Sequence, residues 1–185
     1  MTDHSALIAL LAERSAKRGQ FVLSSGKQST FYIDARLTTM SPEGLSIIGP
    51  LVLTVLEQTG WSIDAVGGLT LGADPISYAI SYASADSEHP LRAFTVRKDV
   101  KAHGTGKQLE GPFKPGDRVA VIEDVITTGA SALKAIDAIR KADGIVVGIL
   151  ALVDREEGGL QELEKAGFPV VALATATQII SILRA

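Results

Sequence analysis

The chain has 185 residues, of which 46% are apolar and 21% charged, a composition that suits a single domain over residues 1–185 and excludes a disordered or collagen-like chain. Its 18 lysines and arginines against 21 aspartates and glutamates give a net charge of −3, which argues against nucleic acid or an anionic membrane as the main partner. The lack of cysteine excludes disulfides and thiolate-bound metals and fits a cytoplasmic location.

The first forty residues predict a small subdomain. Apolar residues at near-helical spacing predict a helix over residues 5–17. Two short apolar runs, residues 21–23 and 30–33, flank a polar stretch and predict a hairpin. The segment lacks the pattern of a signal peptide, and no apolar run in the chain reaches the about 20 residues that cross a bilayer. We therefore expect neither a leader nor a membrane partner.

The remaining chain alternates between helices and strands. Ser41 as an N-cap and Pro42 at the first helical position predict a helix that runs to Gln58, with a kink at Pro50. Asp74 and its following proline predict the cap of a second helix, over residues 74–82. Further helices are predicted over residues 130–141 and 160–165, and strands over 65–68, 91–96, 118–122, 145–153 and 170–173. This alternation predicts an α/β fold with a parallel sheet flanked by helices.

The stretch after the third of these strands carries the strongest chemical signal. Glu123 and Asp124 follow the strand, and a turn over residues 127–131 then opens a helix. Ligands of open α/β sheets bind at the carboxyl ends of the strands. The amides and hydroxyls of the turn suit a phosphate monoester, whereas the two acids suit hydroxyl groups or hydrated Mg²⁺. The pattern indicates a phosphorylated sugar, and a solvated turn that merely caps a helix is the alternative.

A second segment, residues 97–107, is strongly basic. It holds four lysines and arginines against one aspartate, together with Gly104 and Gly106. Glycines without apolar periodicity predict a mobile loop, and such a loop can close over a polyanion and stabilise a leaving group. A solvated hairpin is the alternative interpretation.

These segments resemble a known family. Residues 123–131 resemble the phosphoribosyl pyrophosphate (PRPP) motif of type I phosphoribosyltransferases. Residues 97–111 and 24–34 resemble orotate phosphoribosyltransferases in particular, and the likeness extends from about Phe21 to Arg155. It implies a type I phosphoribosyltransferase-like parallel sheet, a hood subdomain formed by about residues 1–40, and a flexible basic loop.

The resemblance implies a pentosyltransferase, which transfers ribose 5-phosphate from PRPP to orotate and yields orotidine 5′-monophosphate and pyrophosphate. The step belongs to UMP synthesis. Mg²⁺ would be held through PRPP oxygens and water, with no direct protein ligand. The family also implies a homodimer in which the basic loop is shared between subunits.

Residue roles follow from the same resemblance. Lys101, His103 and Asp124 would be catalytic, with His103 either neutralising charge or donating a proton. The residues assigned to PRPP are Arg97, Lys98, Lys101, His103, Glu123, Asp124, Val125, Ile126, Thr127, Thr128, Gly129, Ala130 and Ser131. The residues assigned to orotate are Lys27, Phe31, Tyr32, Thr127 and Arg155.

The chain departs from the family pattern at two positions. Ser24 stands where many members have a lysine. Lys27 nearby replacing that lysine, and the role going unfilled, are both consistent with the sequence. The loop over residues 68–74 also lacks the lysine that many members carry on the pyrophosphate side. The second departure weakens the inference that this loop contacts pyrophosphate as it does in the family.

Two other functions remain open at this point. A phosphoribosyltransferase for a purine or for uracil would share residues 123–131, but it would lack the basic loop pattern and the Phe31–Tyr32 region. A non-catalytic regulator that senses PRPP and binds nucleic acid would need a basic face outside the site. Consumption of orotate with PRPP and Mg²⁺ separates the three.

Overall fold

The structure is a computed structural model that describes residues 4–22, 28–99 and 107–183. Within these residues the central sheet has six strands in the order β5-β4-β3-β6-β7-β8, all parallel except the edge strand β5. The strands are β3 (Ala65–Leu69), β4 (Arg92–Val96), β5 (Leu109–Glu110), β6 (Arg118–Ile126), β7 (Ile145–Asp154) and β8 (Val170–Thr175). The predicted parallel α/β fold is confirmed, with β5 as an addition.

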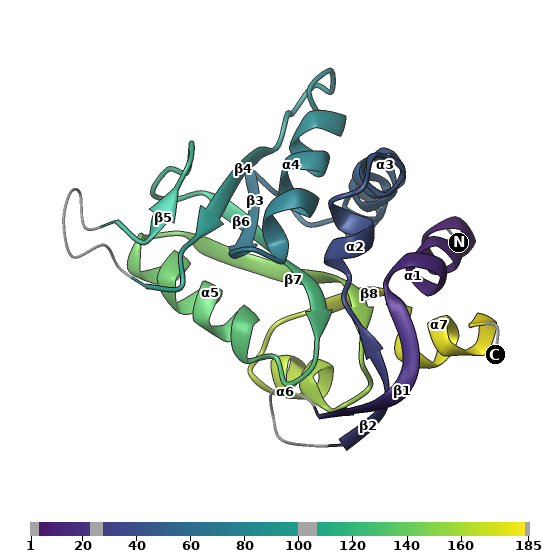
Figure 1. Cartoon of the computed structure of the whole chain (residues 1–185). Coiled ribbons are helices and arrows are strands. Elements are labelled where there is room, and N and C mark those ends of the chain that lie inside the picture. The colour runs from purple at the N-terminus through teal and green to yellow at the C-terminus, as the bar shows by residue number, and fades with distance from the viewer. Residues whose placement is uncertain (1–3, 23–27, 100–106, 184–185) are drawn as a thin grey trace.

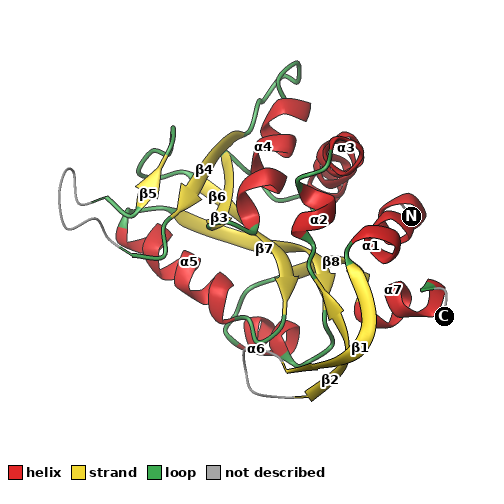
Figure 2. Ribbon diagram, viewed as in Figure 1, coloured by secondary structure: helices red, strands yellow, loops and turns green. Residues whose placement is uncertain are grey.

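Helices cover both faces of this sheet (Figures 1 and 2). One buried cluster joins the sheet to helices α1 (Ser5–Arg14), α3 (Pro42–Gln58), α4 (Ala73–Ala83) and α7 (Ala176–Ile182). A second cluster joins it to α5 (Ala130–Lys141) and α6 (Gly159–Lys165). Since both faces are covered, strands such as β6 are apolar and fully buried over Val119–Ile122, as parallel sheets require. None of the described helices is long and apolar enough to span a bilayer.

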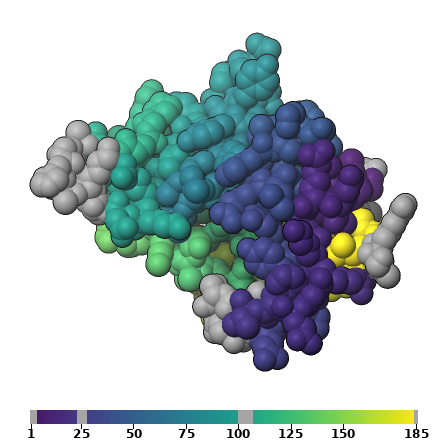
Figure 3. Space-filling view, viewed as in Figure 1, coloured from purple at the N-terminus to yellow at the C-terminus, as the bar shows by residue number. Residues whose placement is uncertain are grey.

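The predicted hairpin forms a two-stranded antiparallel sheet of its own, made of β1 (Ala16–Val22) and β2 (Gln28–Ile33). It stands out from the body of the molecule (Figure 3). The helix before it is shorter than predicted, because the chain turns into β1 at Ala16 and the backbone N–H of Asp34 donates to the carbonyl of Ser15. Leu7 and Leu11 of α1 are fully buried, so this helix packs into the core while the hairpin projects.

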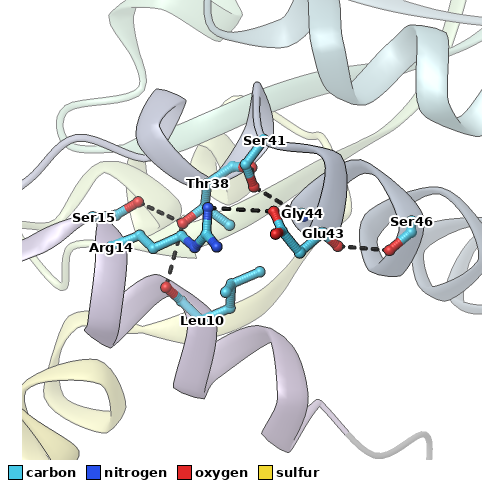
Figure 4. A network of polar contacts seen from close by, with 8 residues as sticks. All are labelled: Leu10, Arg14, Ser15, Thr38, Ser41, Glu43, Gly44 and Ser46. Carbon is cyan, nitrogen blue, oxygen red and sulfur yellow. Dashed lines mark hydrogen bonds and ion pairs between the residues drawn. The ribbon is translucent and has the colours of Figure 1, made fainter.

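Polar contacts fasten the base of the hairpin to the helices (Figure 4). A short helix, α2 (Arg36–Thr39), follows β2 and was not predicted. The Thr38 hydroxyl lies 2.7 Å from the Ser15 hydroxyl, and the Ser41 hydroxyl donates to the Thr38 carbonyl at 2.9 Å. Arg14 of α1 forms an ion pair with Glu43 of α3 at 3.3 Å. These contacts hold α2 in place beside the first turn of α3.

The two predicted helix starts have different outcomes. The Ser41 hydroxyl accepts a hydrogen bond from the backbone N–H of Gly44 at 3.0 Å, which confirms it as the cap of α3, and Pro50 lies inside that helix. Asp74 does not cap α4, which begins one residue earlier. Its carboxylate instead accepts hydrogen bonds from the Thr70 and Thr95 hydroxyls at 2.7 and 2.9 Å, because both lie beside the loop after β3.

Candidate functional site

A cavity of about 500 Å³ opens where β3, β6 and β7 end, beside the base of the hairpin. This is the edge at which open α/β sheets bind ligands. Eight residues assigned to substrates from the sequence line it, namely Tyr32, Lys98, Glu123, Asp124, Val125, Thr127, Ser131 and Arg155. The cavity therefore gathers residues from β2, from the end of β4 and from the ends of β6 and β7.

Strand β6 brings the two acids into the cavity. The strand continues to Ile126, four residues further than predicted, so Glu123 and Asp124 lie within it and not beyond its end. Glu123 is buried, and burial raises the pKa of its carboxyl group well above the ordinary value, with a further contribution from the charge of Asp124. Two adjacent acids in which one resists ionisation suit the hydroxyl groups of a ribose.

The loop after β3 closes against Asp124. A Cβ atom on Gly72 would overlap the Asp124 carboxylate, so a larger residue here would displace that carboxylate. The same carboxylate accepts a hydrogen bond from the backbone N–H of Val125 at 2.9 Å. Residues 69–72 thereby form the wall of the cavity next to the acids, and they contribute backbone groups, two leucine side chains and the Thr70 hydroxyl but no cation.

The turn over residues 127–131 forms another wall. Gly129 has φ +80° at the N-terminus of α5, a conformation that strains residues with a Cβ. The backbone N–H of Ala130 donates to the Thr128 hydroxyl at 3.4 Å, and Thr127 and Ser131 line the cavity. Hydroxyls and amides at the start of a twelve-residue helix form a site suited to a phosphate group.

Arg155 follows β7 and lies beside this turn because β6 and β7 are neighbours. Its backbone N–H donates to the Ile126 carbonyl at 2.9 Å. The side chain is buried, and its guanidinium carbon lies 4.8 Å from the centroid of the Phe31 ring. Nε lies 2.9 Å from a Glu157 carboxylate oxygen, an ion pair without hydrogen-bond geometry, and Nη2 has no hydrogen-bond partner. A buried guanidinium with open donors suits a ligand carboxylate.

The hairpin contributes aromatic rings. Tyr32 lines the cavity and packs against Phe21 with ring centroids 5.5 Å apart. Phe31 packs against the core and reaches the site through its contact with Arg155. Lys27, assigned to orotate from the sequence, lies outside the described residues.

The basic loop is described only at its ends. Lys98 lines the cavity. Arg97 points to a different partner, since its guanidinium lies 3.5 Å from a Glu110 carboxylate oxygen. Lys101 and His103 lie outside the described residues.

Mg²⁺ fits this donor set through a hydrated contact. The described residues contain no group of three acidic, histidine or cysteine side chains able to hold a metal ion. Asp124 offers carboxylate oxygens on one wall, beside the buried carboxyl group of Glu123, and Mg²⁺ commonly binds one or two carboxylates together with water and substrate phosphates.

Sequence reasoning assigned no role to one pair of cavity residues, of which Asp34 ends the family-like segment 24–34 and Arg36 lies outside it. Arg36 donates from Nε and Nη2 to the two carboxylate oxygens of Asp34 at 2.8 and 2.9 Å, and both residues line the cavity. The hydrogen bonds lower the pKa of Asp34 and raise that of Arg36. No periodicity or motif marks Arg36, because its place in the cavity depends on the packing of α2.

Curated proteins with similar sequences share one name. The chain is 45% identical over 183 residues to the orotate phosphoribosyltransferase of Aquifex aeolicus, covering 97% of this chain and 99% of that protein. It is 41% identical over 170 residues to the orotate phosphoribosyltransferase of Pyrococcus furiosus, covering 92% and 91%. No family model matches the chain.

Solved structures agree with these relatives. Orotate phosphoribosyltransferase of Mycobacterium tuberculosis, solved with PRPP, superposes with a TM-score of 0.75 at 32% identity, covering 94% of this chain and 90% of that one. The enzyme from Aeropyrum pernix superposes with a TM-score of 0.78 at 36% identity, covering 96% and 97%. Adenine phosphoribosyltransferase of Leishmania donovani, at 16% identity and a TM-score of 0.65, shares the fold alone.

Proposed function

Since the chain belongs to the orotate phosphoribosyltransferase family, we propose that its cavity transfers the ribose 5-phosphate unit of PRPP to N1 of orotate, a step of pyrimidine nucleotide synthesis. One observation carries the assignment: Arg155, whose buried Nη2 has no hydrogen-bond partner, lines the same cavity as the acid pair and the phosphate-like turn. A carboxylate-bearing base and a phosphorylated sugar are the ligands that match these groups.

PRPP occupies the wall formed by β6 and the turn after it. The 5′-phosphate lies on the turn over residues 127–131, where amides and hydroxyls converge. The ribose hydroxyls lie against Glu123 and Asp124, whose oxygens accept hydrogen bonds from them. This arrangement places the anomeric carbon between the acid pair and the hairpin.

Orotate lies between the ribose and the hairpin. Its carboxylate pairs with the Arg155 guanidinium, which stacks on the Phe31 ring. Tyr32 and Thr127 border the base. Lys27 completes the base site in this proposal. Uracil lacks the carboxylate, so it would leave the Arg155 donors buried and unpaired, which disfavours it.

The reaction exchanges two bonds at the anomeric carbon. The bond from this carbon to the pyrophosphate oxygen breaks with its electron pair leaving on pyrophosphate, while N1 of orotate gives its proton to an oxygen of the departing pyrophosphate and bonds to the carbon. The sugar has oxocarbenium character between these events, so no covalent nucleophile is required. Lys101, Lys98, Arg97 and His103 stabilise the leaving pyrophosphate, and the protein contributes orientation and charge.

Mg²⁺ supports this chemistry in the proposal. Asp124 and Glu123 would hold it through water, together with the oxygens of PRPP. When bound, the ion supplies charge neutralisation for pyrophosphate.

The same proposal includes a homodimer that shares the basic loop. An exposed apolar face on α3 and α4 is a suitable contact surface: Leu45, Tyr78 and Tyr82 are 36%, 53% and 87% exposed and border one groove. Mixing inactive Lys101→Ala and Asp124→Asn subunits tests the shared loop, because one site of a hybrid dimer regains both groups. Recovered activity supports it, and no recovery indicates sites complete within one chain.

We assign the hairpin and its flanking residues, up to about residue 40, the role of a hood over the cavity. The hairpin contributes Tyr32 from one side, whereas the sheet contributes the other walls. We also assign the cytoplasm as the location, because PRPP carries several negative charges and does not cross a bilayer unaided.

A single assay tests the central proposal. The absorbance of orotate is followed with PRPP and Mg²⁺ present, and with uracil or adenine replacing orotate in parallel reactions. Loss of orotate that depends on PRPP supports the assignment. Turnover of uracil or adenine without turnover of orotate contradicts it.

A further inference from the structure

We propose that Arg36 is a pyrophosphate-binding residue, which supplies from the hood side of the cavity the positive charge that the loop after β3 lacks. This inference rests on the proposed function, because it names a further contact for PRPP in the same cavity. It concerns a side chain that no motif marks and that lies on the described helix α2.

The cavity proposed for PRPP is also lined by Arg36. In PRPP the pyrophosphate and the 5′-phosphate are carried by different carbons on opposite sides of the ribose ring, so with the 5′-phosphate on the turn over residues 127–131 the pyrophosphate meets lining residues outside that turn. These residues include 69–72, Lys98 and Arg36. Because Gly72 lies directly against the Asp124 carboxylate, the loop wall and the acid are in contact.

The charges of this part of the cavity are unbalanced without Arg36. Residues 69–72 read Leu-Thr-Leu-Gly and contain no cation. Asp124 adds a negative charge at the same place. Of the described residues that line the cavity, the cations are Lys98, Arg36 and Arg155. Arg155 is placed beside the base site and pairs with Glu157, whereas Arg36 pairs with Asp34 through Nε and Nη2 and keeps Nη1 outside that pair. A pyrophosphate group with several negative charges needs cations at this position.

The orientation of Arg36 is fixed by its neighbours. Nε and Nη2 donate to the two carboxylate oxygens of Asp34, and the backbone N–H of Arg36 donates to the same carboxylate at 3.1 Å. This clamp leaves Nη1 free of the Asp34 contact. Arg36 and Asp124 line the same cavity, and Asp124 contributes, after Asp34 and Tyr32, to raising the pKa of the guanidinium.

The helix that carries Arg36 is firmly attached. Thr38 is fully buried, and its hydroxyl contacts the Ser15 hydroxyl and donates to the Leu10 carbonyl at 3.4 Å (Figure 4). Ser41 closes the same network from the start of α3. A cation on a well-packed helix loses less conformational entropy on binding an anion than a cation on a flexible loop does.

The test measures binding rather than turnover. Arg36→Met removes the charge and keeps the alkyl length, and Arg36→Lys keeps the charge without the planar fork. The control is Arg14→Met, which removes an arginine from another half-exposed ion pair, with Glu43, outside the cavity. Calorimetry on the full chain gives the affinities for magnesium pyrophosphate, PRPP and orotidine 5′-monophosphate, and thermal melting confirms that each variant folds.

We expect Arg36→Met to lower the affinities for pyrophosphate and PRPP by roughly tenfold to a hundredfold, because one hydrogen bond between charged groups is lost. Its affinity for orotidine 5′-monophosphate should stay within about twofold of wild type. The pyrophosphate affinity of Arg36→Lys should lie between those of wild type and Arg36→Met, and the affinities of Arg14→Met should match wild type. Unchanged pyrophosphate affinity in Arg36→Met overturns the inference, as do equal losses for pyrophosphate and orotidine 5′-monophosphate or a wild-type chain that binds no pyrophosphate.

The two proposals fail in different ways. A wild-type chain that turns over orotate, combined with normal pyrophosphate binding in Arg36→Met, overturns the role of Arg36 alone. A wild-type chain that binds PRPP without consuming orotate overturns the proposed function, and the role of Arg36 is then still decided by the pyrophosphate affinities.

Discussion

The guanidinium of Arg155 lies over the ring of Phe31, 4.8 Å from its centroid, and this contact joins the central sheet to the hairpin at the cavity. The ring covers one face of the guanidinium, so its remaining donors lie in the plane that an incoming carboxylate must share. In the proposed base site, recognition of orotate would thus depend on the hairpin and the central sheet together, although the hairpin forms a separate sheet.

We predict that Arg155→Met raises the KM for orotate by roughly tenfold to a hundredfold, because it removes a charged hydrogen bond of about 1.5–3 kcal/mol. The affinity for PRPP should change little, since its phosphate and ribose bind to other residues. Steady-state kinetics with each substrate varied in turn provide the measurement.

The chain offers a matched control for this change. Arg140 stacks over Phe168 at 4.9 Å, a geometry close to that of Arg155 over Phe31, and it does not line the cavity. Arg140→Met should leave both KM values near those of wild type. Equal effects of the two substitutions would show that Arg155 acts through packing and not through the substrate.

The pKa of Glu123 predicts a dependence of stability on pH. Burial raises this pKa in the folded state, so the folded protein binds the proton more tightly than the unfolded chain does. The contribution to stability is complete below the ordinary glutamate pKa of about 4.5 and is lost as the pH rises through the folded value. The free energy of unfolding should therefore fall over this range.

Glu123→Gln isolates this effect, because the amide has nearly the same shape and does not ionise. Urea unfolding from pH 5 to 8 should show a flatter dependence for the variant, which becomes more stable relative to wild type as the pH rises. Parallel curves for the two proteins would contradict a raised pKa at Glu123.

Lys101 provides a prediction that rests on the family resemblance, since it lies outside the described residues. Lys101→Ala should lower kcat by about 10²-fold or more, as expected when one donor to a developing charge is removed, and weaken PRPP binding less. The control is Lys165→Ala, which removes an exposed lysine paired with Glu162 on α6. An unchanged kcat in Lys101→Ala would exclude a catalytic role.

Local signals in the sequence predicted most of the fold. The helix over residues 42–58 has the predicted bounds because Ser41 and Pro42 determine its start. The helix over residues 130–141 begins directly after Gly129, whose left-handed backbone conformation favours glycine. Helix α7 was missed although Thr175 and Gln178 form a capping box at its start. Helix α2 has no such signal, since buried contacts of Thr38 hold it.

Only the part of the candidate site that is formed by residues close in the sequence was predictable from local patterns. Glu123, Asp124 and the turn after them lie close in sequence, so their spacing alone indicates a site. Arg155 reaches that turn only through the parallel pairing of β6 with β7, in which Ile126 lies opposite Asp154. Arg36 depends on how the hairpin and α2 pack against the sheet, and no local pattern contains that information.

Gly129 and Gly116 allow backbone strain to be separated from steric overlap at the phosphate turn. Both have positive φ, +80° and +87°, so an added Cβ costs about 1–2 kcal/mol at either position. At Gly129 the Cβ would also lie 2.9 Å from Leu163 Cγ and 3.1 Å from the Gly159 carbonyl oxygen, whereas at Gly116 nothing lies within 4 Å.

Gly129→Ala should therefore destabilise the protein more than Gly116→Ala does in urea unfolding. It should also weaken PRPP binding, because relief of the overlap moves the amides and hydroxyls of the turn away from α6. Gly116→Ala should keep wild-type affinity, since it changes a turn outside the cavity. If calorimetry finds normal PRPP affinity in a folded Gly129→Ala variant, the 5′-phosphate does not depend on the conformation of this turn, and the placement of PRPP along β6 has to be revised.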